Sequence, residues 1–232
     1  MSGMIDFHSH ILPGIDDGSD SLEMSLRMMR LEAEQGIKRV VATPHFYPQY
    51  DSPDRFLKRR YEAESRLRAE ISRHAGLPEL TVGGEVYFFP HMSHVDALRD
   101  LTIAGTEYIL IEMPSAPWTS QMYQELERIY INQGLTPIVA HVERYLGPFL
   151  DNRVEKRLAD LPVLVQSNAS FLMNGNRGLR MLRKHQIHLL GSDCHNMTDR
   201  KPNLGQARQR IIEKLGAEAL EWINANGREV LG

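Results

Sequence analysis

This 232-residue sequence has little that would mark it as secreted, membrane-bound or nucleic-acid-binding. Its single cysteine, Cys194, excludes an internal disulfide framework and predicts a reducing, cytoplasmic location. No N-terminal basic and apolar segment resembles a signal peptide, and no apolar run approaches the ~18 residues of a membrane span. A net charge of −3 gives no reason to expect a nucleic-acid partner. The composition therefore predicts a soluble globular protein.

Predicted strands and helices alternate along the whole chain. After a first strand that carries His8 and His10, short apolar runs predict strands at 38–43, 80–84, 108–111, 137–140, 163–165 and 187–190. Strands that alternate with helices at this pitch are typical of repeated βα units around a parallel sheet. Seven such strands favour a barrel, complete or incomplete, over an open sheet. Because the sequence shows neither repeats nor a linker, we expect a single domain over residues 1–232.

Two helix starts have clear sequence signals. Asp20 and Glu23 resemble an N-terminal cap and its reciprocal partner, and Ser52-Pro53 begins a longer helix with proline at its first position. The longer helix is rich in basic residues, which are Arg55, Lys58, Arg59, Arg60, Arg66 and Arg68. The simplest interpretation of these residues is a solvated face, and the alternative is a docking surface for an acidic partner.

The residues that carry chemistry lie where the predicted strands end. Nine of them are histidine, aspartate or glutamate: His8, His10, Asp17, His45, Glu85, Glu112, His141, Asp193 and His195. His8 and His10 should point the same way, because a strand alternates its side chains between two faces. In a barrel of βα units the C-terminal ends of all strands form one rim. Each residue alone is explained by a buried hydrogen bond, but nine at one rim indicate bound metal.

The mixture of ligands narrows the choice of ion. Imidazoles and carboxylates without a usable thiolate suit Mn, Fe, Zn or Co, and nine ligands are enough for two or three ions. Three divalent ions with four carboxylates and one hydroxide would leave the site slightly positive, whereas two ions would leave it negative. A positive site attracts a phosphate dianion, and Arg144 adds a planar pair of donors suited to phosphate oxygens.

Six motifs carry a resemblance to a known family. They are IDFHSHILPGIDDG from residue 5, ATPH at 42–45, GGEVYF at 83–88, LIE at 110–112, AHVERY at 140–145 and GSDCHN at 191–196. With these motifs in order, the chain resembles the PHP (polymerase and histidinol phosphatase) superfamily, and within it the bacterial tyrosine-protein phosphatases of capsule and exopolysaccharide operons. The resemblance implies an α/β fold, a distorted (β/α)7 TIM-like barrel known as the PHP fold. It also implies three divalent ions at the C-terminal rim of the strands, most often Mn, with Fe, Zn, Co or Mg as alternatives.

The resemblance further implies roles for individual residues. One metal would be held by His8, His10, Glu85 and Asp193, a second by Glu85, Glu112 and His141, and a third by Asp17, His45 and His195. Arg144 and Asp17 would be the catalytic residues, with Arg144 binding the phosphate and Arg200 a second candidate for substrate contact. The implied reaction is hydrolysis of phosphotyrosine by metal-activated hydroxide. The implied substrate is a phosphotyrosine protein, such as a bacterial tyrosine autokinase that controls capsule or exopolysaccharide synthesis.

Four alternatives stay open on the sequence alone. The same metal site would serve a small-molecule phosphoesterase of the superfamily, such as a histidinol-phosphatase. A metal-dependent amidohydrolase also begins with His-x-His, but it usually needs a lysine at a strand end, which no predicted strand here has. A scaffold that binds a kinase without chemistry would have no need of Asp17 and Arg144. Cys194 and Arg200 have the Cys-x5-Arg spacing of cysteine-dependent phosphatases, but the residues between them include no glycine to shape a phosphate loop.

Overall fold

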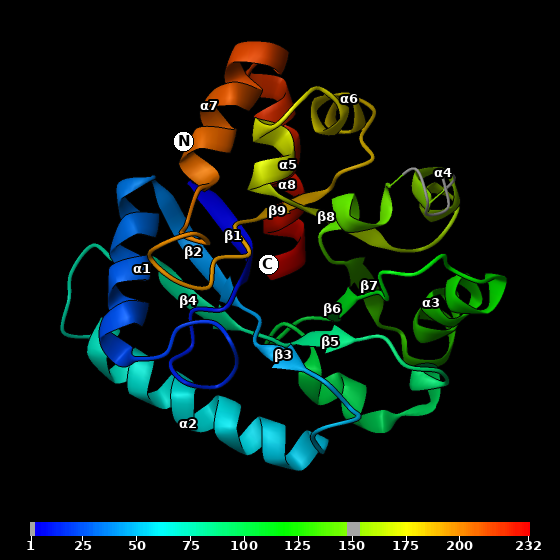
Figure 1. Ribbon diagram of the computed structural model, residues 1–232, viewed down its shortest axis with the longest axis horizontal. Coiled ribbons are helices and arrows are strands. Elements are labelled where there is room, and N and C mark those ends of the chain that lie inside the picture. Colours follow the sequence, from blue (N-terminus) through cyan, green and yellow to red (C-terminus); the bar gives the residue numbers. More distant parts are fainter. Residues whose placement is uncertain (1–2, 148–153) are drawn as a thin grey trace.

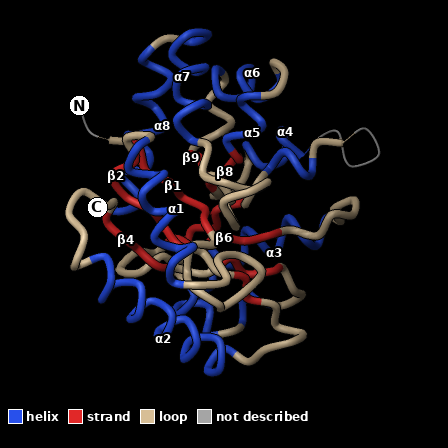
Figure 2. The backbone as a smooth tube through the Cα atoms, turned by 60° about the vertical axis from the view of Figure 1, so that its left-hand side comes forward, coloured by secondary structure: helices blue, strands red, loops and turns tan. Residues whose placement is uncertain are grey.

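The computed structural model describes residues 3–147 and 154–232, and its strands lie inside a layer of helices (Figure 1 and Figure 2). The strands are β1 (Met4–Ser9), β2 (Ile37–Ala42), β3 (His45–Phe46), β4 (Glu79–Val82), β5 (Glu85–Tyr87), β6 (Tyr108–Glu112), β7 (Thr136–Val139), β8 (Leu164–Asn168) and β9 (Leu189–Gly191). The helices are α1 (Leu22–Glu34), α2 (Pro53–Ile71), α3 (Ser120–Gln133), α4 (Val154–Ala159), α5 (Ala169–Met173), α6 (Arg177–Arg183), α7 (Leu204–Leu215) and α8 (Ala217–Leu231). Short 3-10 helices lie at Met92–His94, Asp96–Leu101 and Val142–Tyr145. The predicted alternation of strands and helices is therefore confirmed.

The strands pair in parallel throughout the described sheets. One sheet has the order β1-β2-β4 and the other has the order β3-β5-β6-β7-β8-β9. The last strand returns to the first, since the Asp193 N–H donates to the His8 carbonyl at 2.8 Å and the His10 N–H donates to the Cys194 carbonyl at 2.9 Å. The α/β class and a curled parallel sheet are thus confirmed, but the pairing divides the strands between two sheets rather than one closed ring of seven.

The second and third predicted strands, at 38–43 and 80–84, are each followed after a bend by a further short strand, which the sequence did not predict. Pro44 has no N–H with which to continue the ladder at one bend. At the other, a side chain on Gly83 would place its Cβ 3.2 Å from the Cα of Ile103, so glycine allows the close approach. His45 and Glu85 consequently begin β3 and β5 in the second sheet, instead of continuing β2 and β4 in the first sheet.

Helix α2 begins as predicted, with Ser52 as its N-cap and Pro53 in the first turn. The predicted cap of α1 is wrong by one residue. Ser21, rather than Asp20, has the extended backbone of an N-cap, and its hydroxyl accepts the N–H of Met24 at 3.2 Å. The preceding loop turns the Ser21 side chain, rather than that of Asp20, toward the free N–H groups at the start of α1.

Each long helix buries one apolar face against the core. Met28 and Met29 of α1, Phe56 and Leu67 of α2, and Leu126 of α3 are fully buried. None of the helices in the described residues is long and apolar enough to cross a membrane. Because helices cover the sheet, as Figure 1 shows, polar side chains for chemistry are gathered at the strand ends.

Candidate metal centre

The nine histidine, aspartate and glutamate residues predicted from the sequence meet at one end of the sheets, near where β1, β2, β4, β6, β7 and β9 end. They are His8 in β1 and His10 directly after it, Asp17 on the following loop, His45 and Glu85 at the starts of β3 and β5, Glu112 at the end of β6, His141 after β7, and Asp193 and His195 after β9. The Nε2 atoms of His8 and His10 lie 3.1 Å apart, as alternation along a strand predicts. Parallel strands share this edge, so residues far apart in the sequence become neighbours.

Glu85 lies at the middle of the group and is fully buried. Its Oε2 is 3.1 Å from His8 Nε2, 3.3 Å from His10 Nε2 and 2.9 Å from His45 Nδ1. Its Oε1 is 2.8 Å from His141 Nε2. Burial raises the pKa of Glu85, but the charge on His8 and the other imidazoles close to the carboxylate outweigh burial and hold the pKa well below its usual range. Glu85 is therefore an anion shared by four imidazoles.

A second group surrounds Asp17. Its Oδ1 lies 3.5 Å from His45 Nε2 and 3.5 Å from His195 Nε2, and His10 offers a ligand atom to the same cluster. The Nδ1 of His195 lies 3.0 Å from the carbonyl oxygen of Asp193, which leaves Nε2 free to face Asp17. The Asp17 side chain is 66% exposed, so the centre opens to solvent on this side.

Glu112 completes a third group. Its carboxylate clusters with His45 and Glu85, and its Oε1 lies 3.6 Å from His141 Nε2. His10, His45 and Glu85 each belong to two of the three groups. The clusters therefore overlap, as expected where neighbouring ions share ligands.

The free atoms and the charges of the centre fit bound cations. Among the described residues, His45 Nδ1, Glu85 Oε2 and His195 Nε2 are buried without a hydrogen-bond partner. They lie close to other polar atoms at angles unsuited to hydrogen bonds, as expected for ligands that face a common space. Burial disfavours charge on His10, but the carboxylates of Asp16 and Glu85 outweigh burial and raise the pKa of His10 to about 10. The surrounding carboxylates therefore favour a positive charge at this position. The nitrogen and oxygen donor set suits Mn, Fe, Zn or Co.

Comparison with known proteins identifies the family of this chain. A family model described as capsular polysaccharide synthesis, CpsB/CapC, matches residues 4–231. The chain belongs to this family. The tyrosine-protein phosphatase CpsB of Streptococcus agalactiae is 28% identical over 230 residues, covering 93% of this chain and 92% of that protein. The tyrosine-protein phosphatase YwqE of Bacillus subtilis is 27% identical over 244 residues, covering 98% of this chain and 91% of that protein.

A solved structure of the CpsB/CapC family matches the whole fold. It belongs to the crystal structures of YwqE from Bacillus subtilis and CpsB from Streptococcus pneumoniae, described as unique metal-dependent tyrosine phosphatases. The TM-score is 0.85 at 26% identity, and the match covers 98% of this chain and 94% of that chain. The family resemblance predicted from the motifs is therefore confirmed.

Two arginines of this CpsB/CapC chain reach the rim where the sequence predicts them. Arg144 extends one guanidinium nitrogen to Glu112 (3.1 Å) and another to Asp193 (2.9 Å), and Arg200 contacts the second oxygen of Asp193 at 2.8 Å. Asp193 and His141 have positive φ angles of 52° and 30°, which non-glycine residues rarely adopt. Such strain is common at functional sites.

Two further residues of this family member orient predicted ligands and were not singled out from the sequence. The Asp16 carboxylate accepts a hydrogen bond from His10 Nδ1 at 2.7 Å, and the Tyr145 hydroxyl lies 3.2 Å from His141 Nδ1. In each case the bond at Nδ1 leaves Nε2 available for metal. Asp16 directly precedes Asp17 in the first motif and Tyr145 ends the motif AHVERY, and these positions are the signals that the sequence offered.

Strand β8 supplies neutral side chains to the same end of the sheet. The Gln166 Oε1 lies 3.2 Å from His8 Nδ1 and accepts the N–H of His141 at 2.6 Å. Asn168 donates from Nδ2 to Asp193 at 2.9 Å. Neutral amides are weak metal ligands, so the residue types gave no reason to select them.

Cys194 lies in the core, away from the open side of the centre. Its side chain is fully buried, and burial raises the pKa of the thiol well above its usual range. The Arg200 guanidinium contacts Asp193 rather than forming a phosphate loop with the thiol. This geometry gives no support to a cysteine nucleophile.

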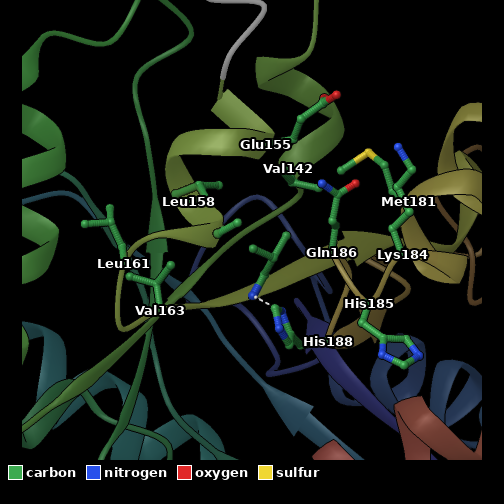
Figure 3. A pocket seen from close by; sticks show the side chains of 12 residues that line it. Val142, Glu155, Leu158, Leu161, Val163, Met181, Lys184, His185, Gln186 and His188 are labelled. Carbon is green, nitrogen blue, oxygen red and sulfur yellow. Dashed lines mark hydrogen bonds between the residues drawn. The ribbon is translucent and has the colours of Figure 1, made fainter.

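The cavity in Figure 3 contains none of the nine predicted ligands. It encloses about 300 Å³, with Leu158 and Val163 on one side and Lys184 and His188 on the other. The His188 ring accepts the N–H of Val165 at 3.1 Å. His188 therefore has an ordinary structural partner.

Proposed function

We propose that this chain is a metal-dependent protein-tyrosine phosphatase. The observation that carries the proposal is the convergence of nine imidazole and carboxylate side chains around Glu85, with Arg144 at the rim. Relatives across nearly the full chain, named tyrosine-protein phosphatases, support the same reaction.

The test compares three phosphate monoesters with Mn²⁺-loaded protein: a phosphotyrosine peptide, a phosphoserine peptide and histidinol phosphate. We expect the phosphotyrosine peptide to have the highest kcat/KM. A preference for histidinol phosphate by orders of magnitude would support the small-molecule phosphoesterase instead.

We infer that three divalent ions, most often Mn, occupy the centre. The proposed ligands are His8, His10, Glu85 and Asp193 for one ion, Glu85, Glu112 and His141 for a second, and Asp17, His45 and His195 for a third. The overlapping clusters support shared ligands, with His10 and His45 each near a second group. When bound, the ions supply Lewis acidity and lower the pKa of the attacking water.

The chain's own residues bind and orient the phosphate. The Arg144 guanidinium offers two donors in one plane, which suits two oxygens of a phosphate. Arg200 lies beside it on Asp193 and is the second proposed contact. A tyrosine leaving group with a pKa near 10 needs little proton donation, so the reaction does not depend on a strong general acid.

The proposal also covers the substrate, the barrel architecture and the location of the protein. We propose that the substrate is a bacterial tyrosine autokinase that controls capsule or exopolysaccharide synthesis, and the family description, capsular polysaccharide synthesis, supports the capsule context. The hydrogen bonds between the segment that follows β9 and the end of β1 support a distorted (β/α)7 barrel, with residues 1–232 as one metallophosphatase domain. A cytoplasmic location stays a prediction.

Replacing Cys194 by serine should leave kcat almost unchanged, because the proposed nucleophile is water. Steady-state kinetics with a phosphotyrosine peptide, alongside metal analysis, makes the measurement. The buried hydroxyl should cost about 1–3 kcal/mol of folding stability. A loss in kcat of more than about a hundredfold, ~2.7 kcal/mol in the barrier, with metals still bound would revive the cysteine mechanism.

Gln166→Leu should lower Mn²⁺ affinity by about 10- to 100-fold, because His8 and His141 would lose the oxygen that orients them. Gln133→Leu is the matched control, since Gln133 is a buried amide that binds the carbonyl oxygens of Ser93 and Val95 instead. Calorimetric Mn²⁺ titration of both folded variants makes the comparison. Equal losses of affinity would show that Gln166 has no specific orienting role.

A further inference from the structure

A groove leads from the metal centre onto helix α2. Its inner part, about 310 Å³, is lined by Asp17, His45 and Tyr47, and its outer part, about 510 Å³, lies along α2. Both parts share Tyr50, Asp51 and Arg59, so they lie next to each other on the surface. A molecule held at the metals therefore has a path along α2.

The inner wall of the groove is aromatic. The Tyr47 ring stacks on the His45 imidazole, with centroids 5.0 Å apart and an angle of 29° between planes. Tyr50 follows with its ring centroid 6.3 Å from that of Tyr47. The Tyr50 side chain is 77% exposed, so packing in the fold does not account for it. An exposed tyrosine such as Tyr50, next to a reaction centre, offers a flat apolar face for a bound peptide.

The basic residues along α2 are mostly exposed, as the solvated-face interpretation predicts, but several arginines also have structural partners. Arg59 donates to the carbonyl of Ile15 at 2.8 Å, and Arg66 donates to the carbonyl of Pro13 at 2.9 Å. Both bonds hold the loop that carries Asp17. Arg59 and Arg66 therefore help to position the Asp17 loop at the metal centre.

The outer part of the groove retains positive charge. Asp51 is neutralised by ion pairs with Arg55 and Arg59. Lys58 is exposed, and across 3–147 and 154–232 it has no ion-pair partner. Glu62 lines the far end of the groove. Two arginines and a lysine against two carboxylates leave an excess of one positive charge.

We propose that this groove binds the polypeptide beside the phosphotyrosine, with Lys58 pairing with an acidic side chain of the substrate. The inference rests on the proposed function, because the phosphate must occupy the metal centre. From Arg55 to Glu62, α2 rises about 10 Å, which matches roughly three residues of extended peptide. The preferred substrate is therefore a phosphotyrosine segment with glutamate or aspartate within about three residues.

The experiment compares three substrates: a phosphotyrosine peptide with acidic neighbours, the same peptide with these replaced by amides, and p-nitrophenyl phosphate. Lys58→Glu should lower kcat/KM for the acidic peptide about tenfold more than for p-nitrophenyl phosphate, mainly through KM, because like charges then meet. The amide peptide should lose much less. Raised salt should reduce the difference. Tyr50→Ala should weaken both peptides and affect p-nitrophenyl phosphate least.

Lys214→Glu on α7 and Tyr130→Ala on α3 are matched controls, because both residues are exposed and line neither part of the groove. We expect them to change none of the three rates. Equal effects of Lys58→Glu on all substrates, or no effect on any, would overturn the groove proposal while leaving the phosphatase activity established. Failure of the unmodified protein on all three substrates would instead overturn the proposed function, and the groove with it.

Discussion

Exhaustive chelation should abolish phosphotyrosine hydrolysis by this protein, and Mn²⁺ should restore it better than Mg²⁺. Four imidazole nitrogens lie within 3.3 Å of the Glu85 carboxylate, and Mg²⁺ prefers oxygen ligands whereas Mn²⁺ accepts imidazole. Cys194 is buried, so the structure gives no support to a thiol nucleophile that would work without metal. We expect a loss of at least about 1,000-fold, ~4 kcal/mol in the barrier.

The measurement pairs kcat/KM on a phosphotyrosine peptide with metal analysis of the same samples, before chelation, after it and after each ion is added back. Circular dichroism shows whether the metal-free chain is still folded, which separates lost chemistry from lost structure. Full activity in a sample that metal analysis shows to be free of ions would contradict a metal-dependent mechanism.

Arg144→Ala should lower kcat by roughly 10²- to 10³-fold, the usual cost of losing a donor to transition-state charge. Two nitrogens of its guanidinium reach Glu112 and Asp193, so the side chain lies across two proposed ligands. Its side chain is 39% exposed, and a surface ion pair contributes at most about 1 kcal/mol to stability. The melting temperature should therefore hardly change.

Arg177→Ala is the matched control for Arg144. Its side chain is also 39% exposed and pairs with a carboxylate, Glu155, at 2.9 Å. Arg144→Lys should recover only part of the rate, because an ammonium cannot make a planar two-point contact. If Arg144→Ala keeps more than about a third of kcat/KM, or if Arg177→Ala loses as much, the phosphate-binding role is wrong.

The sequence by itself determined the alternating α/β architecture and the residue types at the centre. Strand ends are readable because apolar runs stop at polar residues, and parallel strands bring those ends to one edge. Ser52-Pro53 marked the start of α2 correctly because proline's fixed φ is a local property. The roles of the nine residues as metal ligands stay predictions, although their proximity could be foreseen from strand order.

Only the tertiary structure decided how the ligands are grouped and held. It added two short strands, β3 after Pro44 and β5 after Gly83, because each bend depends on what packs beside it. It also brought Gln166 to His8, 158 positions away in the chain. Such contacts depend on the register between strands and on the direction of each side chain, and neither is encoded in a local sequence pattern.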